Sequence, residues 1–449
     1  MLPLDRDWVD AELDFLRNLG PRLTGSPQHH RLVDRVAEQV RALGLPVAED
    51  RHRFTRWDLT GAAGLSVGGE PVEVASVFPY SGTGRVTGPL VRLRGPVPRW
   101  SRARGGIAVV EVRNRELPFA EVVRVWGSQQ PWEPLAHPLI PATIAGLGLH
   151  RARRAGVRGV VFAWRGLAAE DARGQYVPFT LPYQDIPAAF VAGEAADAVL
   201  DAAARGRSGD LDVPATLTPG ASMRTLWTTV EGTQRPDETV LVVTHTDGTN
   251  VVEENGHIGL LALARDAVDT PPRRTVVFAF VAGHLRIPAV TRSGQAATRW
   301  LRDHPDLWSG PRRAVAGLGV EHLGARAPEL LYATTPRLRD LAAAEWPGTR
   351  VSRPSPLIHF GEGEPLLHHG IPAISLVSAP IDLLSTRPGD HVDPDLLHRQ
   401  VDSFRRVLAR LDDTAADDLG QVRPAGVAAK AVAAARLAVA LARSRRPSS

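Results

Sequence analysis

Between Arg224 and Val320 the sequence alternates short apolar runs with helical stretches, and this alternation constrains the fold more than any other feature. We expect strands at Glu238–Thr244, Arg274–Ala282 and Ala314–Val320, and helices near residues 256–267 and 293–303. Strands that alternate with helices at this spacing are typical of βαβ units, whose strands run parallel. The sequence therefore predicts an α/β fold with a doubly wound, mostly parallel sheet.

Polar side chains follow each of these predicted strands. His245–Gly248 comes after the first strand, Gly283 and His284 after the second, and Glu321 and His322 after the third. In open parallel sheets, ligands bind at the carboxyl ends of the strands. Because the chain contains no cysteine, any metal there must be held by His, Asp or Glu.

The rest of the chain divides into further segments. Residues 8–43 have apolar positions at helical spacing, interrupted at 20–27, and indicate helix, loop, helix. From about residue 60 to 218, short β-rich runs lie among many Gly and Pro, which favours a separately folded insert. The Ala-rich end with spaced Lys and Arg indicates a helix that faces solvent or docks. We therefore expect an N-terminal part of the main domain (1–59), the insert (60–218), the main part (219–415) and a helical tail (416–449).

Composition excludes some partners. The 53 basic and 49 acidic residues are interspersed and give a net charge of +4, so the sustained basic stripe that nucleic-acid binding needs is missing. The sequence contains no window of about 18 uncharged apolar residues, so it predicts no membrane-spanning segment. The first ten residues lack the basic and apolar regions of a secretory signal, which predicts a cytoplasmic location. None of these features sets the oligomeric state.

Several motifs, in this order, resemble the co-catalytic zinc exopeptidases, the family of bacterial aminopeptidases, carboxypeptidase Q, glutaminyl cyclases and the transferrin receptor ectodomain. The matching segments are Gly20–Ser26, Trp227–Gly232, Val243–Asp247, Gly370–Ala373 and Asp390–Leu397. Within the insert, Ala155–Val161 and Ile186–Val191 are similar to a protease-associated domain. The resemblance covers most of the chain and implies the zinc-exopeptidase fold with a β-rich protease-associated insert.

In that family two zinc ions share a bridging Asp, each also takes a His and a carboxylate, and a Glu activates the attacking water. The resemblance implies that His245 is the first ligand and that Asp247, two residues later, orients its imidazole. Glu254 stands at the bridging Asp, and Glu321 at a later Asp ligand. A longer carboxylate at these positions can still bind metal.

Two positions depart from the family pattern. His284 and Leu285 replace a pair of Glu residues that includes the water-activating base, and Ser385 stands at the final His. These losses remove one ligand from each half of a two-zinc cluster, so one zinc ion is favoured over two. The expected ligands are His245, Glu254, Glu321 and His284. Near neutral pH an imidazole can act as a metal ligand or as a base, so His284 is a candidate for either role. His284 and Asp247 are the candidate catalytic residues.

Two further residues are candidates for the substrate side of the site. Glu321 and His322 would point to opposite faces if their strand persists, so we assign the metal to Glu321 and substrate contact to His322. Glu362 lies in an acidic segment that contacts substrate in the family, with a solvated loop as the alternative.

These features predict a divergent metal-dependent hydrolase of the aminopeptidase type that acts on a peptide or amide bond. The alternative is a non-catalytic binding or assembly protein on the same scaffold, favoured by the loss of the Glu pair. The sequence has neither a Gly-x-Ser-x-Gly elbow nor a phosphate-binding loop. Convergence of the candidate ligands within about 5 Å would favour the hydrolase.

Overall fold

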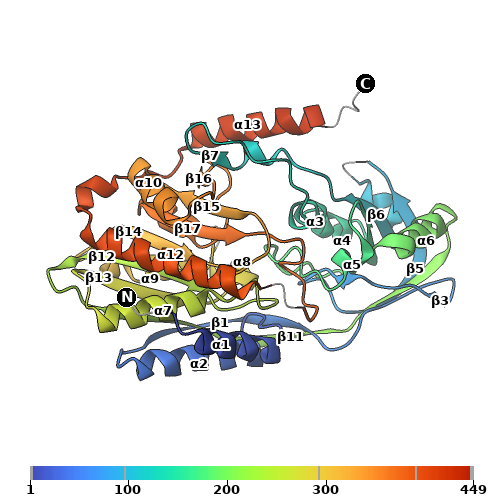
Figure 1. Cartoon of the computed structure of the whole chain (residues 1–449). Coiled ribbons are helices and arrows are strands. Elements are labelled where there is room, and N and C mark those ends of the chain that lie inside the picture. The colour runs from blue at the N-terminus through green and yellow to red at the C-terminus, as the bar shows by residue number, and fades with distance from the viewer. Residues whose placement is uncertain (1–3, 96–97, 292–293, 390–391, 445–449) are drawn as a thin grey trace.

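The structure is a computed structural model that describes residues 4–95, 98–291, 294–389 and 392–444. Within these ranges the larger strands and helices form two lobes (Figure 1). One lobe is built on a nine-stranded sheet and the other on an eight-stranded sheet. The α/β fold class predicted from the alternation is confirmed.

The nine-stranded main sheet carries the predicted α/β alternation. Its strands, in spatial order, are β1 (Ala48–Leu59), β11 (Ala215–Val230), β13 (Arg274–Val281), β12 (Arg235–His245), β14 (Arg313–Val320), β17 (Ala373–Ser378), β15 (Glu329–Ala333), β16 (Val351–Arg353) and β7 (Arg124–Val125). The central strands β13, β12, β14 and β17 pair in parallel. Antiparallel pairs flank them: β1 with β11, β11 with β13, β15 with β17, and β16 with β7.

Helices cover both faces of this sheet, as residues alternating along β12 show. Val240 and Val242 belong to the hydrophobic cluster that includes α7 (Gly256–Asp269), whereas Leu241 and Val243 pack with α9 (Ala297–Asp303). Successive side chains of a strand point to opposite faces, so this strand is buried on both. The other helices around the sheet are α1 (Arg6–Leu19), α2 (Pro27–Ala42), α10 (Pro336–Glu345), α11 (Gly363–His368) and α12 (Pro394–Asp413), with the short α8 (Ile287–Val290).

Capping residues set where the helices begin. Ser26 accepts a hydrogen bond from the His29 N–H at 3.1 Å, and Pro27 occupies the first turn of α2. Asp393 accepts the Leu396 N–H at 3.0 Å at the start of α12. Such caps satisfy N–H groups that have no partner inside the helix. Asp390 and His391 of the last matching motif lie outside the described residues.

The eight-stranded sheet lies inside the segment expected to be an insert. Its strands, in spatial order, are β3 (Glu70–Pro71), β2 (Gly64–Val67), β10 (Ser208–Val213), β5 (Gly84–Leu93), β6 (Ile107–Arg113), β8 (Gly159–Arg165), β9 (Ala188–Val191) and β4 (Ser76–Val77). Its helices are α3 (Leu139–Gly146), α4 (Leu149–Arg154), α5 (Ala169–Ala172) and α6 (Gly193–Ala204). Phe78, Phe162 and Phe190 pack together with ring centroids 5.2 to 5.8 Å apart, so this lobe has an aromatic core.

Two segments join or flank the lobes. β1 and β11 pair antiparallel from Ala48 opposite Trp227 to Leu59 opposite Ala215, and so bring both ends of the second lobe together. The tail forms α13 (Val427–Ser444), which contacts η2 (Phe119–Glu121) and extends outward (Figure 1). No helix in the described ranges has the length and apolar character needed to cross a bilayer.

The buried carboxylate of Glu12 joins α1 to two other helices of the main lobe. Glu12 of α1 is fully buried and accepts hydrogen bonds from Arg35 Nε of α2 at 3.0 and 2.9 Å. His257 Nε2 of α7 lies 3.7 Å from the same carboxylate. Burial alone would raise the pKa of Glu12, but its favourable interactions with His257 and Arg35 outweigh burial and lower the pKa from 4.5 to about 2.

Glu12→Gln should therefore destabilise the protein in a pH-dependent way. A carboxyl whose pKa is lower in the folded state stabilises the fold above its unfolded pKa, and this contribution is lost as the pH falls from about 4.5 towards 2. We expect a loss of about 3 kcal/mol in unfolding free energy at pH 7 and almost none near pH 2. Denaturant unfolding of both proteins across this range measures the difference.

The control is Asp14→Asn, which removes an exposed partner of Arg17 on the same helix. Exposed ion pairs contribute about 0 to 1 kcal/mol, so this variant should differ little from the wild type at any pH. A Glu12→Gln deficit that stayed constant from pH 7 to pH 2 would contradict the assignment.

Candidate metal centre

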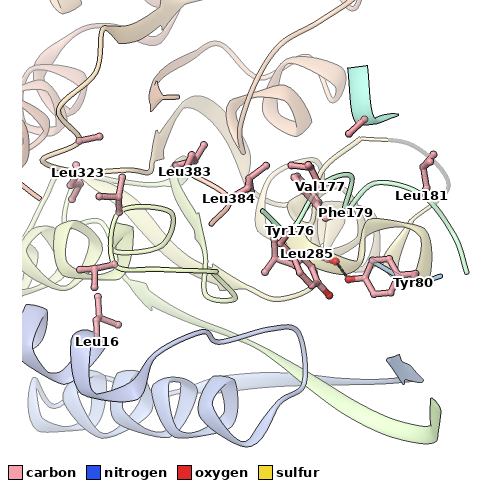
Figure 2. Close-up of a cluster of buried hydrophobic side chains, with 14 of the residues drawn as sticks. Leu16, Tyr80, Tyr176, Val177, Phe179, Leu181, Leu285, Leu323, Leu383 and Leu384 are labelled. Atoms are coloured by element: carbon pink, nitrogen blue, oxygen red, sulfur yellow. Dashed lines mark hydrogen bonds between the residues drawn. The ribbon is translucent and has the colours of Figure 1, made fainter. Parts of the chain in front are cut away.

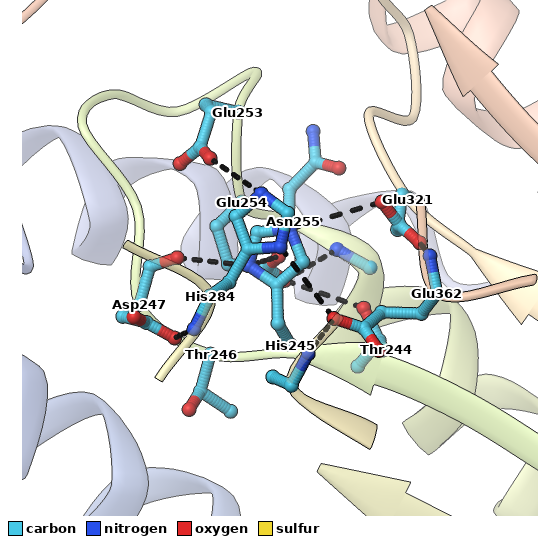
Figure 3. Close-up of polar contacts among 12 residues, drawn as sticks. Thr244, His245, Thr246, Asp247, Glu253, Glu254, Asn255, His284, Glu321 and Glu362 are labelled. Carbon is cyan, nitrogen blue, oxygen red and sulfur yellow. Dashed lines mark hydrogen bonds and ion pairs between the residues drawn. The ribbon is translucent and has the colours of Figure 1, made fainter. Parts of the chain in front are cut away.

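Three neighbouring strands of the main sheet end at one place, and the predicted ligands meet there (Figure 3). His245 ends β12, His284 opens η3 (His284–Arg286) after β13, and Glu321 follows β14. The rings of His245 and His284 stack with centroids 3.9 Å apart and planes 9° apart. His245 Nδ1 lies 3.0 Å from Glu254 Oε2, and its Nε2 lies 3.8 Å from Glu321 Oε2.

A glycine brings the carboxylates of two segments close together. Gly256 opens α7, and a Cβ at this position would lie 2.1 Å from the Val320 carbonyl oxygen. The start of α7 therefore packs directly against the end of β14. This close approach sets Glu254, just before the helix, beside Glu321, just after the strand.

The first group of potential ligand atoms comes from His245, Glu321 and His322. One nitrogen or oxygen of each lies within 4.8 Å of the others, and all three residues are buried. His245 Nε2, Glu321 Oε2 and His322 Nε2 have no hydrogen-bond partner among the described residues. Buried polar atoms without a partner are costly and rare, so the chemistry of this group fits a bound cation.

The contacts of the His245 and His322 rings leave Nε2 of each ring available to bind a metal ion. His245 Nδ1 lies 2.8 Å from the Asp247 carbonyl oxygen, and His322 Nδ1 lies 2.7 Å from the Ser378 carbonyl oxygen. Since carbonyls only accept, the contact of His245 assigns the proton to its Nδ1. The Ser378 N–H also lies 3.3 Å from His322 Nδ1, so in both states of that nitrogen the Ser378 main chain occupies it and leaves Nε2 facing the site. Burial lowers the pKa of His322 to about 3 and that of His245 well below its usual range, so both rings stay neutral.

Glu321 and His322 both reach the site because the strand ends before them. β14 stops at Val320, and His322 has a left-handed backbone with φ of 53°. Glu321 and His322 therefore do not continue the strand, and the expectation that they point to opposite faces does not apply. Asn255 fixes the turn, since it donates to the Leu323 carbonyl at 2.7 Å and accepts the Leu323 N–H at 2.8 Å. Strained, non-glycine backbone of this kind clusters at functional sites.

A second potential group comprises His245, Glu253 and His284. Glu253 Oε1 lies 4.0 Å from His284 Nε2 and has no hydrogen-bond partner within the described ranges. Its other oxygen accepts the Thr249 N–H at 2.9 Å, which holds the carboxylate in place. Burial raises the pKa of Glu253 to about 7 despite the nearby His284. Neither group includes Glu254, whose Oε1 accepts the Gly256 N–H at 3.0 Å.

Asp247 positions the segment after β13 with its carboxylate. Its two oxygens accept the N–H groups of Gly283, His284 and Leu285 at 3.0, 3.2 and 2.9 Å. Thr24, from the first matching motif, also donates to this carboxylate. The expected contact with His245 is made by the main-chain carbonyl of Asp247, because the carboxylate is occupied on the other side.

Glu362 is buried rather than part of a solvated loop. Its oxygens accept the N–H groups of Ala296 and Ala297 at the start of α9, at 3.1 and 2.8 Å. Its Oε1 also lies 3.5 Å from His284 Nδ1. Burial lowers the pKa of His284, but Glu362 and Glu253 outweigh it and raise the pKa to about 9. Glu362 thus keeps His284 cationic near neutral pH.

The cluster contains more buried carboxylates than buried cations. The carboxylates are Asp247, Glu253, Glu254, Glu321 and Glu362, and the cations among the described residues around them are Arg22 and His284. Burial raises the pKa of Glu321 to about 8 and that of Glu254 well above its usual range. These buried carboxyl groups therefore bind protons near neutral pH when no cation is close, and a divalent cation among them would take the place of the protons. Imidazole and carboxylate ligands suit zinc, so the residues present fit the expected metal.

The second lobe reaches the site through Phe179, which lies on the segment that follows α5 (Figure 2). The centroid of its ring is 5.1 Å from that of His284. In the same interface the Tyr80 hydroxyl donates to the Leu285 carbonyl. Ser385, which stands at the family's final His, is outside both groups and donates its hydroxyl to the Arg173 carbonyl at 3.1 Å.

Sequence reasoning missed the possible roles of Glu253 and of His322 as a ligand. The doubled acid Glu253-Glu254 was visible, but only the fold shows that Glu253 faces His284. For His322 the signal was Gly324, since a glycine soon after a strand marks a turn.

The fold of this chain matches that of zinc aminopeptidases of known structure. A peptidase M28 precursor from Shewanella amazonensis matches with a TM-score of 0.67 and 16% identity over 91% of this chain and 93% of that chain. The zinc aminopeptidase BSAP from Bacillus subtilis matches with 0.65 and 15% over 93% and 98%. The aminopeptidase from Aneurinibacillus sp. strain AM-1 matches with 0.64 and 15% over 90% and 93%. No family model and no curated protein matches the sequence.

Proposed function

We propose that this protein hydrolyses peptide or amide bonds, in the manner of an aminopeptidase, with one zinc ion held by His245, Glu321 and His322. The observation that carries the proposal is a group of three buried residues whose potential ligand atoms lie within 4.8 Å of one another and each of which has a side-chain atom without a hydrogen-bond partner among the described residues. Three protein ligands with one open position are typical of catalytic zinc, whereas structural zinc takes four. Glu254 is not a ligand in this set. Its carboxylate lies beside Nδ1 of His245, where it would orient the ligating imidazole.

Zinc in such a site supplies a Lewis acid that polarises a carbonyl and acidifies water. Glu253 would accept the proton of the attacking water and return it to the leaving amine, since a pKa of about 7 suits transfer in both directions. His284 would stabilise negative charge on the substrate carbonyl oxygen as a cation, with Glu362 behind it. Asp247 would hold His284 in register through the backbone of η3.

The second lobe would restrict which substrates reach the site. Phe179 lies against the His284 ring, with the two ring planes tilted by 36°. An apolar ring at this position would contact the substrate residue next to the scissile bond and exclude water around it. The likeness of this lobe to a protease-associated domain supports such a role.

The second candidate is a non-catalytic binding protein on the same scaffold. In its favour, Ser385 and Leu285 stand where the resembling family has metal ligands. Here Ser385 bonds to the second lobe and Leu285 is buried, so both side chains serve packing instead of metal binding. The unpartnered nitrogen and oxygen atoms of the first ligand group and the cluster of buried carboxyl groups around it favour the hydrolase.

Zinc analysis and peptide hydrolysis test the proposal together. Protein purified without chelator and supplied with zinc should hold about one ion per chain. It should release amino acids from unmodified peptides, lose this activity with a chelator and regain it with zinc. A zinc content clearly below one, with no hydrolysis, would leave the binding protein as the function.

A further inference from the structure

Asn250 makes hydrogen bonds on both sides of one amide group. Its Nδ2 donates to the carbonyl oxygens of Asp382, Leu383 and Ser385 at 3.1, 2.8 and 3.0 Å. Its Oδ1 accepts the N–H groups of Val252 and Glu253 at 2.9 and 3.0 Å. The oxygen therefore shapes the turn that carries Glu253, and the nitrogen ties this turn to the loop 381–387.

The loop 381–387 is in turn tied to the second lobe. The Tyr176 N–H donates to the Leu384 carbonyl at 2.7 Å, and the Thr386 N–H donates to the Gly174 carbonyl at 2.9 Å. Gln175 and Ser385 form a β-bridge between these contacts. The bridged stretch leads directly to Phe179, the residue of the second lobe that contacts His284.

The main lobe holds the same turn from the other side. Arg22, which is fully buried, donates from one guanidinium nitrogen to the carbonyls of Asn250 and Glu254 at 2.6 and 3.1 Å. Arg22 fixes the turn to the scaffold, whereas Asn250 fixes it to the loop that the second lobe seats. The two sets of contacts thus meet at Asn250, whose main-chain carbonyl binds Arg22 and whose side chain binds the loop 381–387.

We propose that Asn250 is a positioning residue that couples the seating of the second lobe to the metal centre. This inference rests on the proposed function. Only a carboxamide offers a donor and an acceptor on one planar group of this size, so the link needs Asn at this place. Loss of the link should loosen the carboxylates of Glu253 and Glu254 and, through the loop, the contact of Phe179 with His284.

Asn250→Ser separates the two halves of this role. A serine hydroxyl can still accept from the N–H groups two and three residues later, but it is too short to reach three carbonyls of the facing loop. Zinc affinity should fall about 10- to 100-fold, as for other partners outside the ligand set. The visible absorption spectrum of the cobalt(II) form should also change, because it reports ligand geometry. Amide exchange of residues 173–187 should accelerate.

Ser385→Ala is the matched control. It removes a hydroxyl bond between the same loop and the second lobe but keeps the carbonyl that Asn250 uses. Its zinc affinity and cobalt spectrum should match the wild type. Asn250→Asp, which has the same shape but no donor, covers the case in which the serine variant fails to fold.

The outcomes separate this inference from the proposed function. If the wild type binds zinc and both Asn250 variants bind it equally well with unchanged spectra and exchange, the coupling is absent. If the variants only lower the melting temperature, Asn250 is merely structural and the inference is wrong. If the wild type binds no zinc, the proposed function fails, and amide exchange alone then decides whether Asn250 seats the second lobe.

Discussion

Replacing His245 with alanine should abolish zinc binding, because this side chain belongs to both potential ligand groups. Its Nε2 faces Glu321 and has no other hydrogen-bond partner in the described part of the chain. Loss of a partner outside the ligand set weakens metal binding about 10- to 100-fold, and loss of a ligand should exceed that. Zinc content after dialysis should fall from about one ion per chain to almost none.

Ser385→Ala is again the control, since this side chain belongs to neither group. Its zinc content should equal that of the wild type. Retention of zinc by His245→Ala with unchanged affinity would show that the metal lies elsewhere. Equal loss in both variants would mean that a general loosening of the fold, rather than a missing ligand, releases the ion.

Replacing Glu253 with glutamine should slow catalysis and leave the metal in place. The amide keeps the shape of the side chain but cannot take a proton. Removal of a positioned general base typically costs about 10²- to 10⁴-fold in rate. We expect a fall of this size in kcat on peptide substrates, with KM and zinc content almost unchanged, as measured by initial rates and metal analysis on the same samples.

Glu254→Gln provides the comparison on the neighbouring residue. Glu254 contacts His245 Nδ1 rather than His284, so this variant should weaken zinc binding more than it lowers kcat of the loaded protein. If Glu253→Gln instead loses its zinc, Glu253 is a ligand of the second group and the assignment of the base is wrong.

Regular features of the fold could be predicted because each depends on local sequence. The apolar runs at 238–244, 274–282 and 314–320 became β12, β13 and β14, and the interrupted helical stretch at 8–43 became α1 and α2. Buried parallel strands need continuous apolar sequence, and helices need apolar residues on one face. The order of polar residues after the strands was sufficient to bring His245, His284 and Glu321 together, because parallel strands end at one edge of the sheet.

The details of the site depend on contacts that local sequence does not encode. Glu253 and Glu254 are adjacent and chemically identical, and the Asn250 and Arg22 contacts decide which of them faces His284. His322 joins Glu321 because β14 ends at Val320 and His322 then adopts a left-handed backbone, which the sequence does not encode locally. The contact of Phe179 with His284 joins residues more than a hundred positions apart, which no periodicity reveals.

The pairing of β1 with β11 makes the second lobe the connection of a single hairpin of the main sheet. Leu59 and Ala215 are opposite each other at the far end of this ribbon, so everything between them is the elongated tip of one hairpin. Growth of a hairpin tip leaves the order of the main-sheet strands intact, and the entropy of closing a longer loop rises only slowly with its length. Among the described strands of the main sheet, only the edge strand β7 comes from the residues between β1 and β11, so a shorter connection between these two strands would leave the order of the other strands unchanged.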